Sequence, residues 1–245
     1  MTPPRDAAEA AEAGRPTTEK VRGVFSTIAR RYDLMNSVMS FGLHHVWRRR
    51  TVAEAGLTPG CAVLDIAAGT GDLALALART GLPSKVVATD FVSEMLDIAR
   101  TKAAGWSGPT ELDFEIQDGQ ALTFPDATFD VVTVSFGVRN MPDRAAAFSE
   151  ALRVLTDGGR YLILEFSAPR SALFRPLFKL YTGVIVPLLG AVIAGDRASY
   201  QYLNDSIMQF PAPELLGDEL CAAGFSQVRW VPMLFGAVNL HVATK

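Results

Sequence analysis

Cysteine, histidine and long apolar runs are scarce in this chain of 245 residues. Its two cysteines, Cys61 and Cys221, lie far apart with no metal-ligand pattern around them, which suits a reducing compartment such as the cytoplasm and predicts core or half-buried side chains. The three histidines, His44, His45 and His241, are too scattered to indicate a metal site. The first residues lack the apolar stretch of a secretory signal peptide, so we do not interpret them as one.

An excess of charge of one sign is also lacking. The formal net charge is −3, which argues against a nucleic-acid partner, and 49% of the residues are apolar, which is enough for a sizeable core. The length fits one large α/β domain with added segments. Residues 1–19 consist mainly of Ala, Glu, Pro and Arg, and we expect them to form a mobile tail ahead of a single domain that spans 20–245.

From residue 62 onward, short apolar runs alternate with stretches of helical periodicity. Strands are expected at 62–67, 85–90, 112–116, 129–135 and 161–166, and helices at 72–80, 93–104 and 144–155. Such alternation predicts right-handed crossovers and a parallel sheet. Near the end of the chain we expect a helix at 212–223 and strands at 225–231 and 238–244. The last two strands would close a seven-stranded sheet as an antiparallel hairpin.

Two further segments would cover this sheet. Residues 20–56 have the apolar spacing of helices and predict an N-terminal helical cap. Residues 168–211 are an insertion, whose apolar run at 181–195 has 15 residues, a proline and three glycines. We expect this run to be too short and broken for a transmembrane helix, which needs about 20 residues. It would form a buried cap helix, or a lid that admits a greasy substrate and touches a membrane through Arg170, Arg175 and Lys179; the two roles are compatible.

The most informative stretch is Val63-Leu-Asp-Ile-Ala-Ala-Gly-Thr-Gly-Asp-Leu-Ala74, a strand that enters a glycine turn and then a helix. Open α/β sheets bind ligands at such a turn. The glycine spacing, with Asp90 following, also fits a dinucleotide site and leaves a nicotinamide oxidoreductase open. Asp65 and Asp72 would repel a pyrophosphate, however, and they suit the cationic S-adenosylmethionine. Asp72 could instead only complement the helix dipole.

Four segments together resemble the UbiE/COQ5 family of quinone-ring C-methyltransferases. They are Tyr32-Asp-Leu-Met-Asn-Ser-Val-Met-Ser40 continuing to Trp47, Phe136-Gly-Val-Arg-Asn140, Arg153-Val-Leu-Thr-Asp-Gly-Gly-Arg-Tyr-Leu-Ile-Leu-Glu-Phe-Ser167, and an insertion motif from Gly195-Asp-Arg to Phe210-Pro211. The resemblance covers about residues 20–245. One departure is Thr156-Asp157, where the family usually has Lys followed by Pro or Val. We expect these two residues in the turn before the fifth strand, away from the methyl donor.

The resemblance implies a class I S-adenosylmethionine-dependent methyltransferase fold, a Rossmann-like α/β sheet, and a donor site without a metal. The positions that match the family's donor site are Asp65, Gly69, Thr70, Gly71, Asp90, Asp118, Gly119 and Ser135. By the resemblance, Thr70 and the flanking glycines would cradle the methionine end, and Asp65 would help to hold its ammonium. Asp90 would accept both ribose hydroxyls, Asp118 would accept the adenine amine, and Ser135 would line the methyl-transfer face.

The acceptor should be a reduced quinol, because the attacking ring carbon must be electron-rich. Arg139 and Asn140 follow the fourth strand, and we expect Arg139 to stabilise the phenolate and to organise a water that carries the proton away. Arg139 could instead form a salt bridge with an acid such as Asp143. The resemblance also indicates contacts to the quinol head group, or alternatively helix caps and lid-closing ion pairs, at Tyr32, Asp33, Asn36, Asp196, Arg197 and Tyr200.

We therefore predict C-methylation of a prenylated quinol at the inner face of a membrane, with demethylmenaquinol as the favoured acceptor. The methoxybenzoquinol precursor of ubiquinol is the alternative acceptor within the same family. A non-catalytic quinone- or lipid-binding protein of this fold, and methyl transfer to a sterol or small phenol, also remain open. The sequence leaves the oligomeric state open, a homo-oligomer included.

Overall fold

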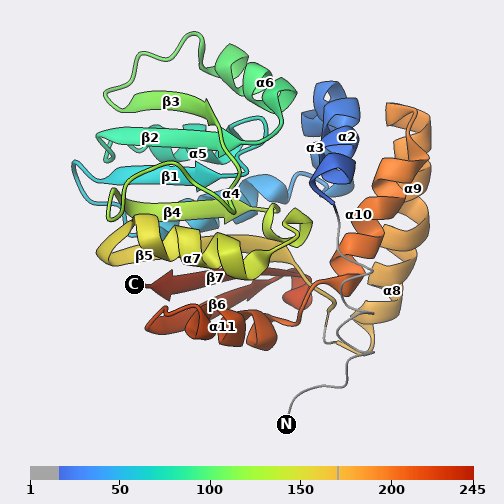
Figure 1. Ribbon diagram of the computed structural model, residues 1–245. Coiled ribbons are helices and arrows are strands. Elements are labelled where there is room, and N and C mark those ends of the chain that lie inside the picture. Colours follow the sequence, from blue (N-terminus) through green and yellow to red (C-terminus); the bar gives the residue numbers. More distant parts are fainter. Residues whose placement is uncertain (1–16, 170) are drawn as a thin grey trace.

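Seven strands form one mixed sheet in the order β3-β2-β1-β4-β5-β7-β6 (Figure 1). In the computed structural model, which describes residues 17–169 and 171–245, neighbouring strands run parallel except for β7, which is antiparallel to β5 and β6. The strands are β1 (Ala62–Ile66), β2 (Lys85–Asp90), β3 (Glu111–Ile116), β4 (Phe129–Ser135), β5 (Leu155–Phe166), β6 (Gln227–Met233) and β7 (Val238–Thr244). The predicted α/β fold with its closing hairpin is confirmed. The strand order reverses between β1 and β4, where sheets of this kind bind ligands.

Helices cover both faces of the sheet. One face packs against α7 (Arg144–Val154) and α11 (Pro213–Ala222), and the other packs against α4 (His44–Glu54) and α5 (Asp72–Ala78). Helix α6 (Ser93–Ala103) packs on β2 and β3. Because both faces are covered, the parallel strands are apolar on both sides, as their near-continuous Val, Leu and Ile runs predict.

Two groups of helices from distant parts of the chain lie together beyond the carboxyl ends of the parallel strands (Figure 1). The first group is α2 (Thr18–Ile28), a short 3-10 turn (Ala29–Arg31) and α3 (Tyr32–Met39). The second is the insertion, which contains α8 (Phe174–Leu180), α9 (Val186–Leu189) and α10 (Arg197–Gln209). Ile28 and Met35 of the first group share one apolar cluster with Val186 and Tyr200 of the second. The two groups therefore form one cap over the strand ends.

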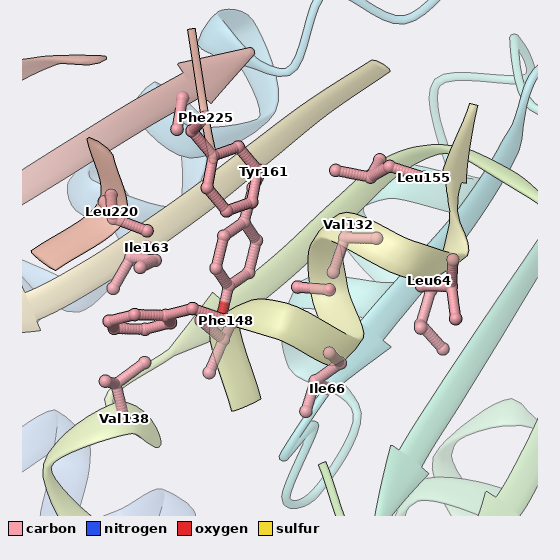
Figure 2. Packing of buried hydrophobic residues seen from close by; sticks show 14 of the residues in the cluster. Leu64, Ile66, Val132, Val138, Phe148, Leu155, Tyr161, Ile163, Leu220 and Phe225 are labelled. Atoms are coloured by element: carbon pink, nitrogen blue, oxygen red, sulfur yellow. The ribbon is translucent and has the colours of Figure 1, made fainter. Parts of the chain in front are cut away.

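A large part of the core lies between the sheet and helices α7 and α11 (Figure 2). Tyr161 of β5 is 1% exposed and stacks on Phe225 with the ring centroids 5.6 Å apart. Phe148 of α7 meets the same tyrosine edge-on at 6.2 Å. Leu64 and Ile66 belong to this cluster, so β1, the strand that leads into the glycine turn, is anchored in the core.

The fifth strand differs from the prediction, because it begins at Leu155 and not near residue 161. Its pairing with β4 shifts register between Phe129 and Val131, and Gly158 adopts a φ of +77°. The expected turn is therefore an irregular, bulged extension of the strand. Thr156, one of the two residues that depart from the family pattern, donates to Asp130 at 3.1 Å, at the end of β5 opposite to the glycine turn.

The N-terminal boundary also differs slightly. Helix α2 begins at Thr18, inside the segment expected to be a tail, because the Thr17 hydroxyl accepts a hydrogen bond from the Lys20 amide at 3.3 Å. This capping contact carries no apolar periodicity, so the pattern missed it. The rest of the expected tail, residues 1–16, lies outside the described residues. Of the cysteines, Cys61 is buried as expected, whereas Cys221 is exposed.

The insertion contains a longer helix than its sequence pattern predicts. A continuous helical run, Phe174–Ala194, has 21 residues, and an 18-residue window of it has a mean hydropathy of 1.9, so it is long and apolar enough to cross a membrane by length and composition alone; 28% of that window is buried. The expectation that this segment is too short was wrong. Pro187 does not end the helix, because π-helical turns at Tyr181–Ile185 and Gly190–Ala194 flank α9 and shift the hydrogen-bond pattern around the residue that lacks an N–H.

Replacing Leu64 with alanine should lower the free energy of unfolding by about 2–5 kcal/mol, because the side chain is 0% exposed and its loss leaves a cavity beneath the glycine turn. Leu173→Ala is the matched control, since Leu173 is 83% exposed and its removal should change stability by about 0.5 kcal/mol or less. Urea unfolding followed by circular dichroism measures both. Equal effects of the two substitutions would contradict this assignment of the core.

Candidate active site

A tight glycine turn joins β1 to α5. Gly69 (φ +57°) and Gly71 (φ +77°) adopt the left-handed conformation that favours glycine. A Cβ at Gly71 would lie 2.8 Å from the Ala99 Cβ, so glycine also allows α5 to approach α6 closely. The Gly69 amide donates to Asp90 Oδ2 at 2.8 Å. The end of β2 therefore fixes a turn that offers bare backbone to a ligand.

Asp90 ends β2 and is 6% exposed. Its Oδ1 accepts the Val92 amide at 2.9 Å, while Oδ2 accepts the amide of Gly69. Burial raises the pKa of the Asp90 carboxyl, and the two amides oppose this effect. Each carboxylate oxygen keeps a further lone pair. Asp90 can therefore still accept two hydroxyl groups from a ligand in the pocket that it lines.

This narrow pocket has a free volume of about 60 Å³. Five of the predicted donor-site residues line it: Gly69, Asp90, Asp118, Gly119 and Ser135. A Cβ at Gly119 would lie 2.6 Å from Ile66 Cγ2, so a side chain there would fill the pocket wall. Asp118 Oδ1 accepts both the backbone amide and the side-chain amide of Gln120, at 2.9 and 3.0 Å.

Helix α2 closes the narrow pocket on the side opposite the sheet, through Thr18, Val21 and Phe25. A volume of 60 Å³ corresponds to about two water molecules. A nucleoside is much larger than this free volume, and α2 is part of the wall that bounds it. The N-terminal cap is thus part of the pocket, which the sequence pattern did not indicate.

A second cavity of about 540 Å³ lies beside the pocket, enclosed by the N-terminal helices, the insertion and the ends of β1, β4 and β5. Its lining is mainly apolar and includes the aromatic cluster of Trp47, Phe136 and Phe166, in which the two phenylalanine rings are 4.6 Å apart. The residues that line both spaces are Phe25, Tyr32, Ala67, Gly69, Ser135, Phe136 and Asn140. The pocket and the cavity therefore share a wall at the ends of β1 and β4, where a group held in one can reach a group held in the other.

Asp65 of β1 borders the larger cavity and is 1% exposed. Its Oδ1 accepts the Thr133 hydroxyl at 2.6 Å, whereas Oδ2 has no hydrogen-bond partner within the described part of the chain. Burial raises the pKa of the Asp65 carboxyl to about 7, and the Thr133 hydroxyl opposes this effect. A buried carboxylate with one free oxygen suits a cationic ligand, because the ligand would compensate the buried charge.

A polar network joins the glycine turn to the N-terminal helices. The Thr70 hydroxyl donates to Asp33 Oδ1 at 2.6 Å, and Lys102 donates to Asp33 at 2.5 Å, to Asp72 at 2.8 Å and to Thr70 at 2.9 Å. Arg48 pairs with the other oxygen of Asp72 at 2.6 Å. Burial alone would raise the pKa of Asp72, but Lys102 and Arg48 hold it below its usual value. Asp33 ties α3 to the turn through these contacts, and an ion pair was one of the two roles expected for it.

Arg139 follows β4 and lines the larger cavity. Its Nη1 donates to Glu165 Oε1 at 2.7 Å and to the Phe136 carbonyl at 2.6 Å, and the Arg139 and Glu165 side chains are 5% and 1% exposed. Burial raises the pKa of Glu165, and the Arg139 charge opposes this effect. An ion pair was one expected role of Arg139, but the expected partner was Asp143 and the observed partner is Glu165. Asp143 instead caps α7 by accepting the Ala146 amide.

The remaining residues expected at the head group divide into two sets. Tyr32, Asn36 and Tyr200 line the larger cavity. Tyr200 is 2% exposed and its hydroxyl has no hydrogen-bond partner among the described residues, and burial raises its pKa to about 12. Asp196 and Arg197 do not line the cavity; Asp196 caps α10 by accepting the Ser199 amide at 3.0 Å, and Arg197 is exposed.

Three lining residues were missed as site candidates. Tyr202 of α10 donates to Asn140 Oδ1 at 3.1 Å and so links the insertion to the shared wall. His44 lines the larger cavity with its Nδ1 2.7 Å from the Ser40 hydroxyl, and burial, His45 and Arg48 lower its pKa to about 4. Arg48 lines the same cavity. His44 lies in the first family motif, and Arg48 is the residue directly after the end of that motif. This position was the signal that could have identified the two residues as site candidates.

The model of the ubiE/COQ5 methyltransferase family matches residues 15–245 of this chain. Among curated proteins, the ubiquinone/menaquinone biosynthesis C-methyltransferase UbiE of Hydrogenovibrio crunogenus is 42% identical over 224 residues, which are 91% of this chain and 88% of that protein. The protein of the same name from Teredinibacter turnerae is 42% identical over 228 residues, which are 93% and 92% of the two chains.

Solved structures share the fold at low identity. A SAM-dependent methyltransferase from Aquifex aeolicus aligns with a TM-score of 0.58 and 19% identity, over 80% of this chain and 88% of that chain. The [4+2]-cyclase SpnF aligns with a TM-score of 0.64 and 18% identity, over 94% and 96%. Since the second is a cyclase by name, the fold alone does not specify the reaction.

Replacing Glu165 with alanine should lower the free energy of unfolding by about 3–5 kcal/mol, because it would leave the Arg139 guanidinium buried without a counter-charge. Glu165→Gln keeps an acceptor for Nη1 and should cost clearly less. Chemical denaturation of both variants measures the difference. If the alanine variant were as stable as the unsubstituted protein, the ion pair would not hold this part of the site.

Proposed function

Since this chain belongs to the ubiE/COQ5 methyltransferase family, we propose that it methylates a ring carbon of a prenylated quinol with S-adenosylmethionine as the donor. Demethylmenaquinol is our first choice of acceptor, and the methoxybenzoquinol precursor of ubiquinol is the alternative, in keeping with the two pathways in the names of the relatives. The observation that carries the proposal is the wall shared by a narrow, polar-edged pocket and a large apolar cavity.

The residues around the narrow pocket fit the donor. Asp90 would accept the ribose hydroxyls, Asp118 and Gly119 would meet the adenine edge, and the Gly69–Gly71 turn would hold the methionine end. Asp65 would accept the ammonium through its free Oδ2. Ser135, in the shared wall, would line the methyl-transfer face. When bound, the donor supplies a methyl group that its sulfonium makes electrophilic.

The larger cavity would hold the acceptor ring against the shared wall. In the reduced quinol, the ring carbon supplies the electron pair for the new carbon–carbon bond as the carbon–sulfur bond breaks, and it then loses its proton. Arg139 Nε has no hydrogen-bond partner among the described residues, and this guanidinium would stabilise the phenolate form of the quinol, while a water carries the proton away. Arg139 cannot itself act as a base, since a guanidinium stays protonated. Asn140, fixed by Tyr202, would orient the ring or this water.

The outer face of the insertion suits a membrane surface. Six exposed apolar side chains follow one stripe of the long helix: Leu173, Leu177, Leu180, Val184, Leu188 and Val192. Leu177 and Leu180 also line the larger cavity, so the stripe runs into the cavity mouth. The exposed Arg175 and Lys179 flank it and would meet lipid phosphates, whereas Arg170 lies outside the described residues. We therefore propose that the protein lies in the cytoplasm, docked peripherally on the inner face of the membrane that supplies the prenylated quinol.

The direct test uses purified protein, methyl-labelled S-adenosylmethionine and each of the two acceptors, in reduced and in oxidised form, with the product mass as the readout. We expect the ring of a reduced acceptor to gain one methyl group and the oxidised quinones to gain none. Arg139→Gln should lower turnover by about 100-fold or more, because it removes the charge that stabilises the phenolate, while the dissociation constant of the donor stays unchanged.

Arg139→Lys is the matched control for charge and should retain part of the turnover. Donor binding without methylation of either quinol would exclude the quinol acceptor and leave the donor site standing. Near-normal turnover of Arg139→Gln would exclude the proposed role of this residue only.

Donor affinity should depend on the ionisation of Asp65. Its pKa of about 7 lies above the ordinary range, so falling pH protonates the carboxyl near neutrality and removes the charge that a cationic donor needs. The affinity should therefore fall as pH drops through 7, and on the alkaline side as the donor's ammonium loses its proton near about pH 8. Titration calorimetry with S-adenosylmethionine measures both limbs.

The Asp65→Asn variant should bind the donor more weakly, and its affinity should no longer fall as the pH drops through 7. Asp97→Asn is the control, because the Asp97 side chain is 71% exposed on α6. Its donor affinity should still fall as the pH drops through 7. An affinity of the unsubstituted protein that does not change across the acid range would rule out Asp65 as the ammonium acceptor.

Membrane docking is tested by co-sedimentation with vesicles of phosphatidylcholine and phosphatidylglycerol. The double variant Val184→Asp/Leu188→Asp should lose binding, since it places two charges on residues that are 55% and 59% exposed in the stripe. Leu215→Asp, at a leucine 57% exposed on α11, is the control and should bind like the unsubstituted protein. Vesicle binding that survives the double variant would place the contact elsewhere.

A further inference from the structure

Among the described residues that line the larger cavity, two carry a permanent positive charge, Arg48 and Arg139. The two arginines come from different elements of the fold. Arg139 follows β4 and is bound to the buried Glu165. Arg48 comes from α4, which packs on one face of the sheet, and pairs with Asp72, the first residue of the helix that follows the glycine turn. An anionic group held beside that turn would therefore meet Arg48.

The neighbouring cation, Lys102, has no hydrogen-bonding capacity left for such a group. An ammonium has three N–H donors. Those of Lys102 are directed to Asp33, Asp72 and Thr70, at 2.5, 2.8 and 2.9 Å. Lys102 thus serves the network that ties α3 to the turn, and it is absent from the cavity lining.

Arg48 retains unused donors. A guanidinium has five N–H donors, and that of Arg48 makes one short contact, from Nη2 to Asp72 Oδ2 at 2.6 Å. Its only other contact with a described residue joins Nη1 to the exposed His45 at 3.4 Å, the long end of the hydrogen-bond range. The side chain is 21% exposed, so it is partly desolvated where it borders the cavity. It is thus able to bind a carboxylate in addition to Asp72.

The methionine end of the donor carries an ammonium and a carboxylate on the same carbon. The buried Asp65, with its free Oδ2, accounts for the ammonium but would repel the carboxylate. Arg48 lines the same cavity, and its charge already acts on Asp65 through space. We infer that Arg48 binds the α-carboxylate of the donor's methionine moiety, opposite to Asp65. This inference rests on the proposed donor site and adds a carboxylate contact from α4.

The consequence is a link between the donor and α4, a helix that helps to line the larger cavity. Arg48 lies one helical turn after His44 and next to Trp47, two residues that line the acceptor cavity. A donor carboxylate bound by Arg48 would therefore hold α4 in the position that shapes this cavity, and the protein would bind its donor before its acceptor.

The test compares two ligands that differ only in the carboxylate, S-adenosylmethionine and its decarboxylated form, by titration calorimetry without any acceptor. The unsubstituted protein should bind the intact donor about tenfold more tightly or better, as a charge-assisted contact predicts. Arg48→Gln should lose this preference, with weaker binding of the intact donor and unchanged binding of the decarboxylated one. Arg49→Gln, at the next residue, which is exposed, is the control and should keep it.

Equal affinity of the unsubstituted protein for the two ligands would overturn the inference, whatever the stability of the variants. So would an Arg48→Gln variant that binds both ligands more weakly by the same factor, because Arg48 would then act only through Asp72. Arg48→Lys keeps the charge and should restore part of the preference. The binding experiment contains no acceptor, so its result can be interpreted even if the protein fails to methylate quinols.

Discussion

The site is organised around a buried carboxylate that forms no ion pair within the described part of the chain. Asp65 is 1% exposed, one of its oxygens is satisfied by Thr133, and the other is free. Such a group is costly to ionise, and its pKa of about 7 reflects that cost. A cationic ligand offsets it. The free oxygen thus favours a donor that carries positive charge over a nucleotide that carries phosphate, a distinction that the glycine spacing alone does not make.

Under the proposed function, the cap joins the donor site to the acceptor site. Its N-terminal part closes the narrow pocket through α2 and reaches the glycine turn through Asp33, while its insertion reaches the shared wall through Tyr202. Both parts also enclose the apolar cavity. Because one set of helices contacts the donor side and the acceptor side, movement of the cap that admits one ligand also changes the space for the other.

The sequence pattern was most reliable where the signals are local. The strands of the sheet and the position of Asp90 follow from apolar runs and from glycine-turn chemistry, which depend on neighbouring residues only. The partner of Arg139 could not be predicted from the sequence. Glu165 lies on β5, which pairs with the strand that precedes Arg139, so the contact depends on strand pairing. The acid that is nearer in the sequence, Asp143, caps a helix. The long helix of the insertion was also missed, because a proline usually ends a helix and the π-helical turns that accommodate Pro187 have no known sequence signal.

The central claim is that the donor's sulfur faces the apolar cavity through the wall shared with the narrow pocket. A crystal structure with S-adenosylhomocysteine tests this most directly. The account predicts the ribose hydroxyls on Asp90, the amino group within hydrogen-bonding distance of Asp65 Oδ2, and the sulfur between Ala67 and Ser135, directed into the cavity. A sulfur turned towards solvent, or an amino group remote from Asp65, would contradict it.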